Sequence, residues 1–191
     1  MISEPDRHRL TVEEYLEAER HSPIKHEYLD GEVEAMAGAS ASHILITGNL
    51  YALIRDRLRG SGCRVLFSDM KVYIARRHRF YYPDLVVTCD DRDRRAEYCL
   101  EFPKLIVEVL SETTEAKDRG DKFADYSELS SLQEYVLVSQ KQQRVECFER
   151  TPQGQWILTR YGPGDVVRFN SVGFDGAIAG IYEDVDLGDR P

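Results

Sequence analysis

The sequence has few cysteines and no metal-binding cysteine motif. Four cysteines occur among 191 residues, Cys63, Cys89, Cys99 and Cys147, and none of them forms a Cys-x-x-Cys pair. The spacing of Cys89 and Cys99 relative to His78 fits no standard zinc pattern. We therefore expect all four cysteines to be reduced and structural.

The sequence also lacks a long apolar run. No segment approaches the roughly 20 apolar residues that a membrane-spanning helix needs. Residues 1–7 are polar and lack the apolar core of a signal peptide. These absences predict a cytoplasmic protein with no membrane partner.

An excess of basic charge is missing as well. The chain has 34 Asp and Glu against 25 Lys and Arg, which gives a formal net charge of −9 at pH 7. This balance argues against a general nucleic-acid coat protein. A nuclease is still compatible with it, because the carboxylates of a metal site add negative charge. The length and the ordinary hydrophobic content favour a single domain over residues 1–191.

Three elements are predicted in the first 60 residues. They are a short helix over residues 11–20 that opens on a capping box, a β-hairpin with its tip near Asp30 and Gly31, and a longer helix that Ser40 or Ser42 caps and that ends at Gly60. Residues 90–95 are six consecutive charged residues, for which we expect a solvated loop.

Strand signals dominate the rest of the chain. The predicted strands cover residues 64–67, 71–74, 85–88, 105–110, 134–138, 144–148 and 155–161. A helix over residues 116–129 separates the fourth of these from the fifth, which implies a crossover and parallel pairing. The last strands form an antiparallel C-terminal meander, and a short helix near residues 177–182 closes the fold. The predicted class is α/β (α+β).

Two acids lie where apolar strands offer them no partner. Asp84 follows Pro83 at the start of one strand, and Glu108 interrupts the aliphatic run of the next. A buried charge is costly unless it is paired or binds a metal. Two carboxylates on neighbouring strands make a hard, oxygen-rich site that suits Mg²⁺ or Mn²⁺. The alternative for Glu108 is a buried ion pair with an arginine.

Lys122 is a candidate cation for the same site. It lies about one helical turn after Asp118, on the same face of the predicted helix. A lysine beside an attacking water can orient it or stabilise negative charge on a phosphate. Judged without a family pattern, a surface ion pair between Asp118 and Lys122 is the better interpretation.

Arginines flank the strand that begins after Asp84. Arg76, Arg77 and Arg79 precede it and can present positive charge to nucleic-acid phosphates. A solvated arginine-rich turn is the alternative. The arginines within residues 90–95 are neutralised by neighbouring aspartates, which makes a role in binding unfavoured there.

The order and spacing of these motifs resemble the Uma-type family of endonucleases, in the PD-(D/E)xK nuclease superfamily. The resemblance covers roughly residues 11–182 and is carried by Tyr28-Leu29-Asp30-Gly31-Glu32, His43, Tyr82-Pro83-Asp84, Glu108-Val109-Leu110-Ser111, Asp118-Arg119-x-x-Lys122-x-x-x-Tyr126 and Glu134-Tyr135-Val136-Leu137-Val138. It implies a restriction endonuclease-like fold, with a mixed β-sheet flanked by helices.

The resemblance also implies roles for residues of the site. Asp84, Glu108 and the Val109 carbonyl oxygen would bind Mg²⁺ or Mn²⁺. The superfamily pattern places a lysine two residues after Glu108, where this sequence has Leu110. Lys122 is the matching position for that lysine in the family.

Glu32 and His43 are further catalytic candidates from the same resemblance. His43 can act as a base or bind phosphate, but a histidine near a helix start is more often a cap or a packing residue. The implied partner is DNA, and the implied assembly is a homodimer. The resulting hypothesis is a metal-dependent endonuclease that hydrolyses phosphodiester bonds in DNA.

Two alternatives to a DNA endonuclease stay open. One is a nuclease directed at RNA, and the other is a non-catalytic nucleic-acid-binding or regulatory module on a nuclease fold. Leu110 at the usual lysine position and the net charge of −9 favour the second.

Overall fold

The computed structural model describes residues 9–188. The terminal segments 1–8 and 189–191 lie outside the described residues. The prediction that residues 1–7 lack the apolar core of a signal peptide concerns the first of these segments. Within residues 9–188, no helix is both long enough and apolar enough to cross a membrane.

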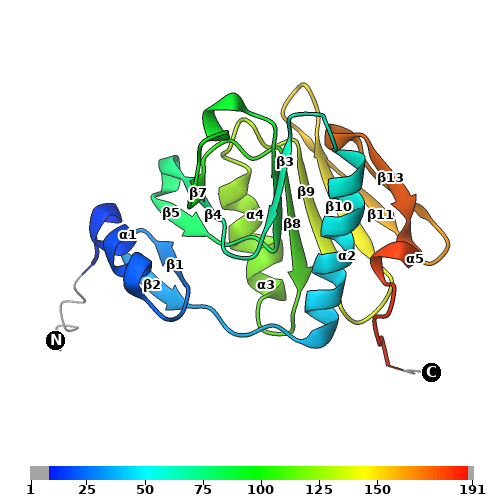
Figure 1. The fold of residues 1–191 in the computed structure, drawn as a ribbon, viewed down its shortest axis with the longest axis horizontal. Coiled ribbons are helices and arrows are strands. Elements are labelled where there is room, and N and C mark those ends of the chain that lie inside the picture. The colour runs from blue at the N-terminus through cyan, green and yellow to red at the C-terminus, as the bar shows by residue number, and fades with distance from the viewer. Residues whose placement is uncertain (1–8, 189–191) are drawn as a thin grey trace.

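Two β-sheets form the centre of the fold (Figure 1). The six-stranded sheet contains, in spatial order, β11 (Trp156–Tyr161), β10 (Val145–Arg150), β9 (Glu134–Ser139), β8 (Leu105–Leu110), β6 (Leu85–Thr88) and β3 (Arg64–Phe67). The five-stranded sheet contains β2 (Glu32–Ala35), β1 (His26–Leu29), β5 (Arg79–Tyr81), β4 (Lys71–Ile74) and β7 (Cys99–Leu100). A separate hairpin pairs β12 (Val166–Phe169) with β13 (Phe174–Ala177).

The strand pairing confirms the mixed sheet. β8 and β9 run parallel, with Leu105 opposite Glu134, and every other pairing in the six-stranded sheet is antiparallel. β9, β10 and β11 make the predicted meander. The β12–β13 hairpin was not predicted, and the neighbouring strands β3 and β4 belong to different sheets.

The first two helices begin where their caps predict. α1 (Val12–His21) opens on the capping box of Thr11 and Glu14, and Ser40 caps α2 (Ala41–Arg57). α2 covers one face of the six-stranded sheet with a buried apolar stripe that packs against alternate strand residues. The stripe contains Ile46, Leu50, Ile54 and Leu58. α5 (Ile178–Ile181), the short closing helix, belongs to the same core.

The opposite face of this sheet packs against β4, β5 and α4 (Phe123–Tyr126). Side chains alternate along β8, so Val107 and Val109 join the core under α2, while Ile106 and Leu110 join the core around α4. Glu108 lies between these last two and therefore points toward α4.

The helix predicted over residues 116–129 is interrupted. α3 (Glu115–Lys117) leads into a π-helical turn over Asp118–Lys122, and α4 follows directly. Asp118 and Lys122 are both buried in this turn. The expected surface ion pair between them is therefore wrong, because their ion pair lies in the interior. Such turns are rare and occur often at functional sites.

The charged segment 90–95 is more ordered than expected. It forms a short 3₁₀ turn, Asp91–Asp93, and the carboxylate of Asp93 is buried. That carboxylate accepts hydrogen bonds from the Thr88 hydroxyl and from the backbone N–H groups of residues 101 and 102. These bonds offset the cost of burying its charge, and the prediction of a wholly solvated loop is wrong for this residue.

The prediction of four reduced cysteines is wrong for Cys63 and Cys89, which form a disulfide. They flank Arg64 and Thr88, a cross-strand pair of β3 and β6, and their Cα atoms lie 4.1 Å apart. No local spacing marks the pair, because 26 positions separate the two cysteines in the sequence. The other two cysteines are free.

Candidate active site

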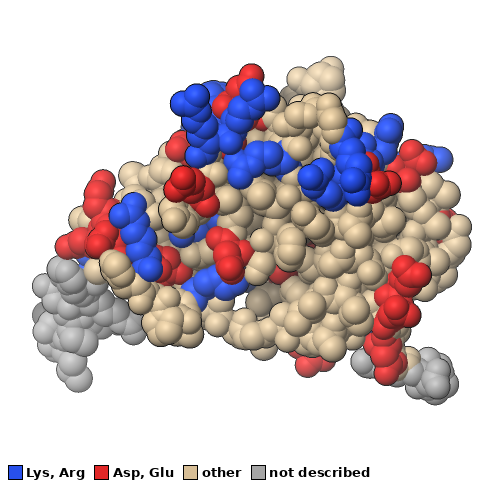
Figure 2. All heavy atoms as spheres, viewed as in Figure 1, with Lys and Arg blue, Asp and Glu red and all other residues tan. Residues whose placement is uncertain are grey.

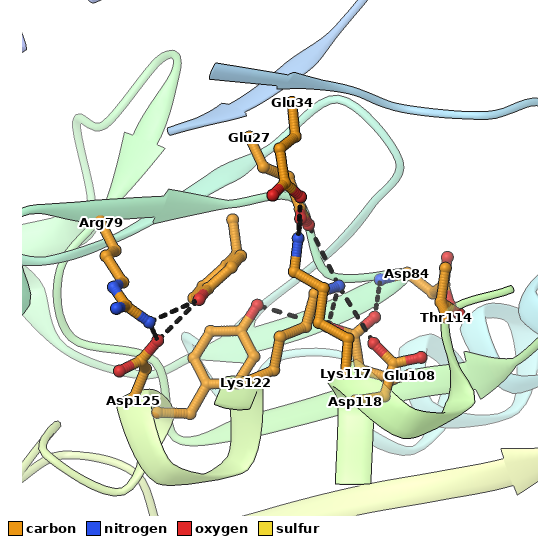
Figure 3. Close-up of polar contacts among 12 residues, drawn as sticks. Glu27, Glu34, Arg79, Asp84, Glu108, Thr114, Lys117, Asp118, Lys122 and Asp125 are labelled. Carbon is orange, nitrogen blue, oxygen red and sulfur yellow. Dashed lines mark hydrogen bonds and ion pairs between the residues drawn. The ribbon is translucent and has the colours of Figure 1, made fainter. Parts of the chain in front are cut away.

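Asp84 and Glu108 lie beside each other, as the sequence predicted (Figure 3). Asp84 immediately precedes β6, and Glu108 lies on the neighbouring strand β8. The Asp84 backbone N–H donates to Glu108 Oε2 at 3.4 Å, and the Val109 N–H donates to Asp84 Oδ2 at 2.7 Å. The pairing of the two strands thus fixes both carboxylates.

Glu108 is almost completely enclosed. Its Oε1 atom accepts hydrogen bonds from Lys122 Nζ at 3.2 Å and from the Tyr126 hydroxyl at 3.3 Å. Burial raises the pKa of Glu108 well above its usual value; the Lys122 charge opposes this shift, and the charges of Asp118 and Asp84 add to it. A bound cation would therefore stabilise the ionised form of Glu108.

Lys122 is surrounded by three carboxylates from three elements. Its Nζ atom lies 3.1 Å from Glu27 on β1, 3.2 Å from Glu108 on β8 and 3.2 Å from Asp118 in the π-helical turn. Burial alone would lower the pKa of Lys122, but the charges of the three acids outweigh it and hold the pKa well above its usual value. Lys122 therefore stays charged at neutral pH, and the cation paired with Glu108 is this lysine rather than an arginine.

Glu27 and Glu34 are site residues that sequence reasoning missed. They lie opposite each other in the β1–β2 hairpin, and both accept from Lys117 Nζ, at 2.7 Å and 2.6 Å. The buried Glu27 also contacts Lys122 and so joins the hairpin to the π-helical turn. The four-residue strand β1 is too short for its alternation to mark Glu27 as buried.

His43 and Glu32, the two further candidates, lie in different surroundings. His43 Nε2 lies 2.7 Å from Asp84 Oδ1, and the Ser40 cap places His43 in the first turn of α2. The side chains of His43 and Asp84 are 16% and 23% exposed, so this pair forms the accessible edge of the site. Glu32 is exposed on β2, and within residues 9–188 no contact joins it to the carboxylates around Lys122.

The three candidate arginines lie on the far side of two tyrosine rings. The ring centroids of Tyr81 and Tyr126 lie 5.4 Å apart. The Tyr126 hydroxyl donates a hydrogen bond to Glu108, whereas the Tyr81 hydroxyl donates one to Asp125. Arg79 pairs with the same Asp125 carboxylate.

The other two arginines of this turn are paired less tightly. Arg77 contacts Glu128 at 3.2 Å, while Arg76 lies 3.8 Å from Glu128 and its side chain is 81% exposed. Arg76 is thus the most exposed of the three candidate arginines.

Leu110 fills the position at which the superfamily pattern has a lysine. It faces the same side of β8 as Glu108 and is buried in the core around α4. Lys122 reaches the Glu108 carboxylate from the π-helical turn instead. A lysine ammonium group is therefore present at the site, but the π-helical turn supplies it rather than β8.

The chemistry of the site fits a hard divalent cation. Two lysines, Lys117 and Lys122, face five carboxylates, those of Glu27, Glu34, Asp84, Glu108 and Asp118. Asp118 Oδ1 is buried, and its contact with Lys122 Nζ at 3.2 Å is an ion pair without hydrogen-bond geometry. Over the described residues, no three His, Cys, Asp or Glu side chains form a preformed metal cluster. Mg²⁺ does not require one, because it is often held by one or two carboxylates, with water and substrate oxygens as its other ligands.

Basic side chains on the face in view gather away from the start of α2. Figure 2 shows Lys and Arg along the upper edge, over the end of α2 and the loops near β7, whereas other residue types cover the start of α2. The last turn of α2 contributes Arg55 and Arg57. His43 lies at the opposite end of that helix, so these arginines are remote from the accessible edge of the site.

Comparisons with known proteins identify a family for this chain. The family model "Uma2: Putative restriction endonuclease" matches residues 12–178. The chain is 38% identical over 174 residues to "Uncharacterized protein slr1290" of Synechocystis sp., with 91% of this chain and 92% of that protein covered. It is 35% identical over 152 residues to "Uncharacterized protein sll1609" of the same organism, with 78% and 86% covered.

A solved structure shares the fold. A crystal structure of "a putative nuclease belonging to DUF820" from Anabaena variabilis superposes with a TM-score of 0.72 at 16% identity and covers 91% of this chain and 98% of its own. This likeness confirms the predicted nuclease-like α+β fold. Because the family model spans residues 12–178 of a chain of 191, the chain belongs to the Uma2 family, described as "Putative restriction endonuclease".

Proposed function

We propose that this chain is a Mg²⁺- or Mn²⁺-dependent endonuclease that hydrolyses phosphodiester bonds in DNA. The observation that carries the proposal is the adjacency of Asp84 and Glu108 in a cluster with more carboxylates than cations. Together with the Val109 carbonyl oxygen, these two acids would hold the metal. When bound, the metal would supply a Lewis acid for the scissile phosphate and lower the pKa of an attacking water.

The surrounding residues hold these acids in place. Lys122 and Tyr126 both donate to Glu108 Oε1, which leaves Oε2 with a single long hydrogen bond from Asp84 N–H. Oε2 is therefore the oxygen of Glu108 that faces Asp84 and is least committed to other partners. His43, at the accessible edge, would accept a proton or bind the phosphate once Asp84 engages the metal.

The proposed partners of the site are nucleic acid and a second copy of the chain. Among the three candidate arginines we assign the nucleic-acid contact to Arg76, since Arg77 and Arg79 are engaged by acids. One active site cuts one strand of a duplex at a time, and two copies can cut both strands together, so we propose that two copies of the chain act together. Light scattering of the chain with and without DNA tests this pairing.

Nicking of supercoiled plasmid in Mn²⁺ tests the endonuclease. The parent chain is expected to nick, and Glu108→Ala is expected not to. Glu97→Gln, a change at an exposed acid away from the site, serves as the matched control and should nick like the parent. Absence of nicking by the parent in both Mn²⁺ and Mg²⁺ would contradict the proposal.

The second candidate function is a non-catalytic nucleic-acid-binding or regulatory module. The buried Leu110 favours it, and so does the enclosure of Lys122 by three acids. Metal-dependent thermal stability separates the two functions, because a ligand that binds only the folded state raises its stability. A metal site predicts stabilisation by Mn²⁺ that Asp84→Ala removes, whereas a module without metal predicts no response in either protein.

A further inference from the structure

The two lysines of the site differ in how much of their hydrogen-bonding capacity is already used. An ammonium group has three N–H donors. Lys122 has three carboxylates within 3.2 Å, and its side chain is 6% exposed. Its ammonium group is therefore enclosed by protein acids, and its place is behind the Asp84–Glu108 pair rather than in contact with substrate.

Lys117 lies at the solvent edge of the same cluster. Its side chain is 25% exposed, and its Nζ atom contacts two acids, Glu27 and Glu34 (Figure 3). The side chain of Glu27 is 7% exposed, whereas that of Glu34 is 55% exposed. Exposed ion pairs contribute little free energy, so Glu34 is the partner that an incoming anion can replace at small cost.

A single carboxylate places Lys117 next to the candidate metal centre. Glu27 accepts from Lys117 through Oε2 and contacts Lys122 through Oε1. Lys122 in turn contacts Glu108. The second acid, Glu34, comes from the adjacent strand of the hairpin, so the partner that can be exchanged lies on the hairpin side of Lys117.

We propose that Lys117 is the cation that binds the phosphodiester backbone of the substrate, and that Glu34 occupies Lys117 until a nucleic-acid phosphate replaces it. The proposal rests on the proposed nuclease function and assigns the phosphate contact to a residue other than Lys122. Glu34 then acts as a built-in competitor for substrate. The competing explanation is structural: Glu27 and Glu34 are like charges directly opposite each other, which destabilises a hairpin, and Lys117 offsets that repulsion.

Metal-free binding of a short fluorescein-labelled DNA duplex to the full chain, measured by anisotropy over a range of salt concentrations, tests the proposal. Lys117→Gln is expected to weaken binding about 3- to 10-fold at low salt and to reduce the slope of log affinity against log salt by about one. Lys117→Arg should keep that slope. Glu34→Gln should bind several-fold more tightly than the parent.

The control for net charge is Glu13→Gln, which removes one exposed acid from α1. Binding by Glu34→Gln that is no tighter than binding by Glu13→Gln would overturn the proposal, and so would an unchanged salt slope in Lys117→Gln. Thermal unfolding checks that each variant folds. Should Lys117→Gln not fold, the comparison of Glu34→Gln with Glu13→Gln decides.

The readout also separates this proposal from the proposed function. Binding without metal needs no cleavage, so a parent that binds with the expected variant pattern but never nicks plasmid contradicts the endonuclease alone. A parent that nicks plasmid while Glu34→Gln and Lys117→Gln behave like the parent contradicts the assignment of Lys117 alone.

Discussion

Two charge clusters lie side by side in this protein, on either side of the Tyr81 and Tyr126 rings. In one, Arg77 and Arg79 are matched by two acids, Asp125 and Glu128. In the other, two lysines face five carboxylates. Figure 3 shows Arg79 with Asp125 at one end and Glu108 with Asp84 at the other.

The balance of charge in a cluster helps to distinguish a structural cluster from a binding site. A cluster with matched charges gains nothing from a further ion, because each buried charge already has its partner. A cluster with excess carboxylates leaves negative charge without a counter-ion in the interior, and a divalent cation relieves it. This imbalance, rather than burial alone, is the reason that we propose the Glu108 cluster as the functional one.

The largest expected effect is on metal-dependent activity. Glu108→Gln should lower nicking at least about 1,000-fold, because it removes one of two carboxylates that act together. It should also abolish stabilisation by Mn²⁺ while leaving the metal-free protein as stable as the parent, since a neutral side chain relieves the excess charge. Plasmid nicking and thermal unfolding measure these effects. A loss of several kcal/mol in the metal-free variant would instead make this cluster structural.

The matched cluster should respond in the opposite way. Asp125→Ala leaves Arg79 and the Tyr81 hydroxyl without their acceptor, and breaking a buried pair of this kind costs about 3 kcal/mol of unfolding free energy. The response to Mn²⁺ should be unchanged. Urea denaturation with and without Mn²⁺ measures both, with Asp125→Asn as the milder control. A cost below about 1 kcal/mol would show that this cluster does not hold the fold together.

The Glu108 cluster should also make the stability of the metal-free protein depend on pH. The folded-state pKa of Glu108 lies above its usual value of 4.5, so the folded protein binds this proton more tightly than the unfolded chain does. Its stabilising contribution is complete below about pH 4.5 and is lost as pH rises through the folded-state pKa. Asp118, whose pKa is also raised by burial, acts in the same direction.

Unfolding measured across pH tests this expectation. The metal-free parent should lose stability with rising pH over that window, and Glu108→Gln should lose less. Mn²⁺ should flatten the parent's curve, because a bound cation favours the ionised carboxylate. An identical pH dependence in the parent and in Glu108→Gln would remove Glu108 as the source.

The smallest expected effect concerns Arg76, a solvent-exposed arginine beside the matched cluster. Arg76→Gln should change the free energy of unfolding by less than about 0.5 kcal/mol, because its pair with Glu128 is exposed. It should weaken DNA binding only a few-fold, with a small reduction in salt dependence. Anisotropy across salt measures this, and an unchanged salt dependence would remove Arg76 from the proposed interface.

Structural features that depend on a single segment of the chain could be predicted from the sequence. The capping residues placed α1 and α2. The apolar runs of β6 and β8 singled out Asp84, just before β6, and Glu108, within β8, as acids at buried strands. Strand-helix-strand order gave the parallel pairing of β8 with β9. In each case neighbouring residues in the chain carry the physical cause, whether a cap, a period or an apolar run.

Contacts between segments that lie far apart in the chain could not be predicted from the sequence. The spacing of Asp118 and Lys122 predicts a surface ion pair, whereas the π-helical turn buries Lys122 among acids from three elements. Glu27 was missed because the five-stranded sheet, which the sequence did not predict, brings β1 to that turn. The Cys63–Cys89 disulfide depends in the same way on the register of β3 against β6.

The candidate acids Asp84 and Glu108 and the starts of the main helices follow from the sequence, because burial patterns and caps act over a few residues. Which cation each acid meets, and which lysine stays exposed, depends on the tertiary structure. Pairing between charges depends on the packing of segments far apart in the chain, and spacing along the chain carries little record of that packing.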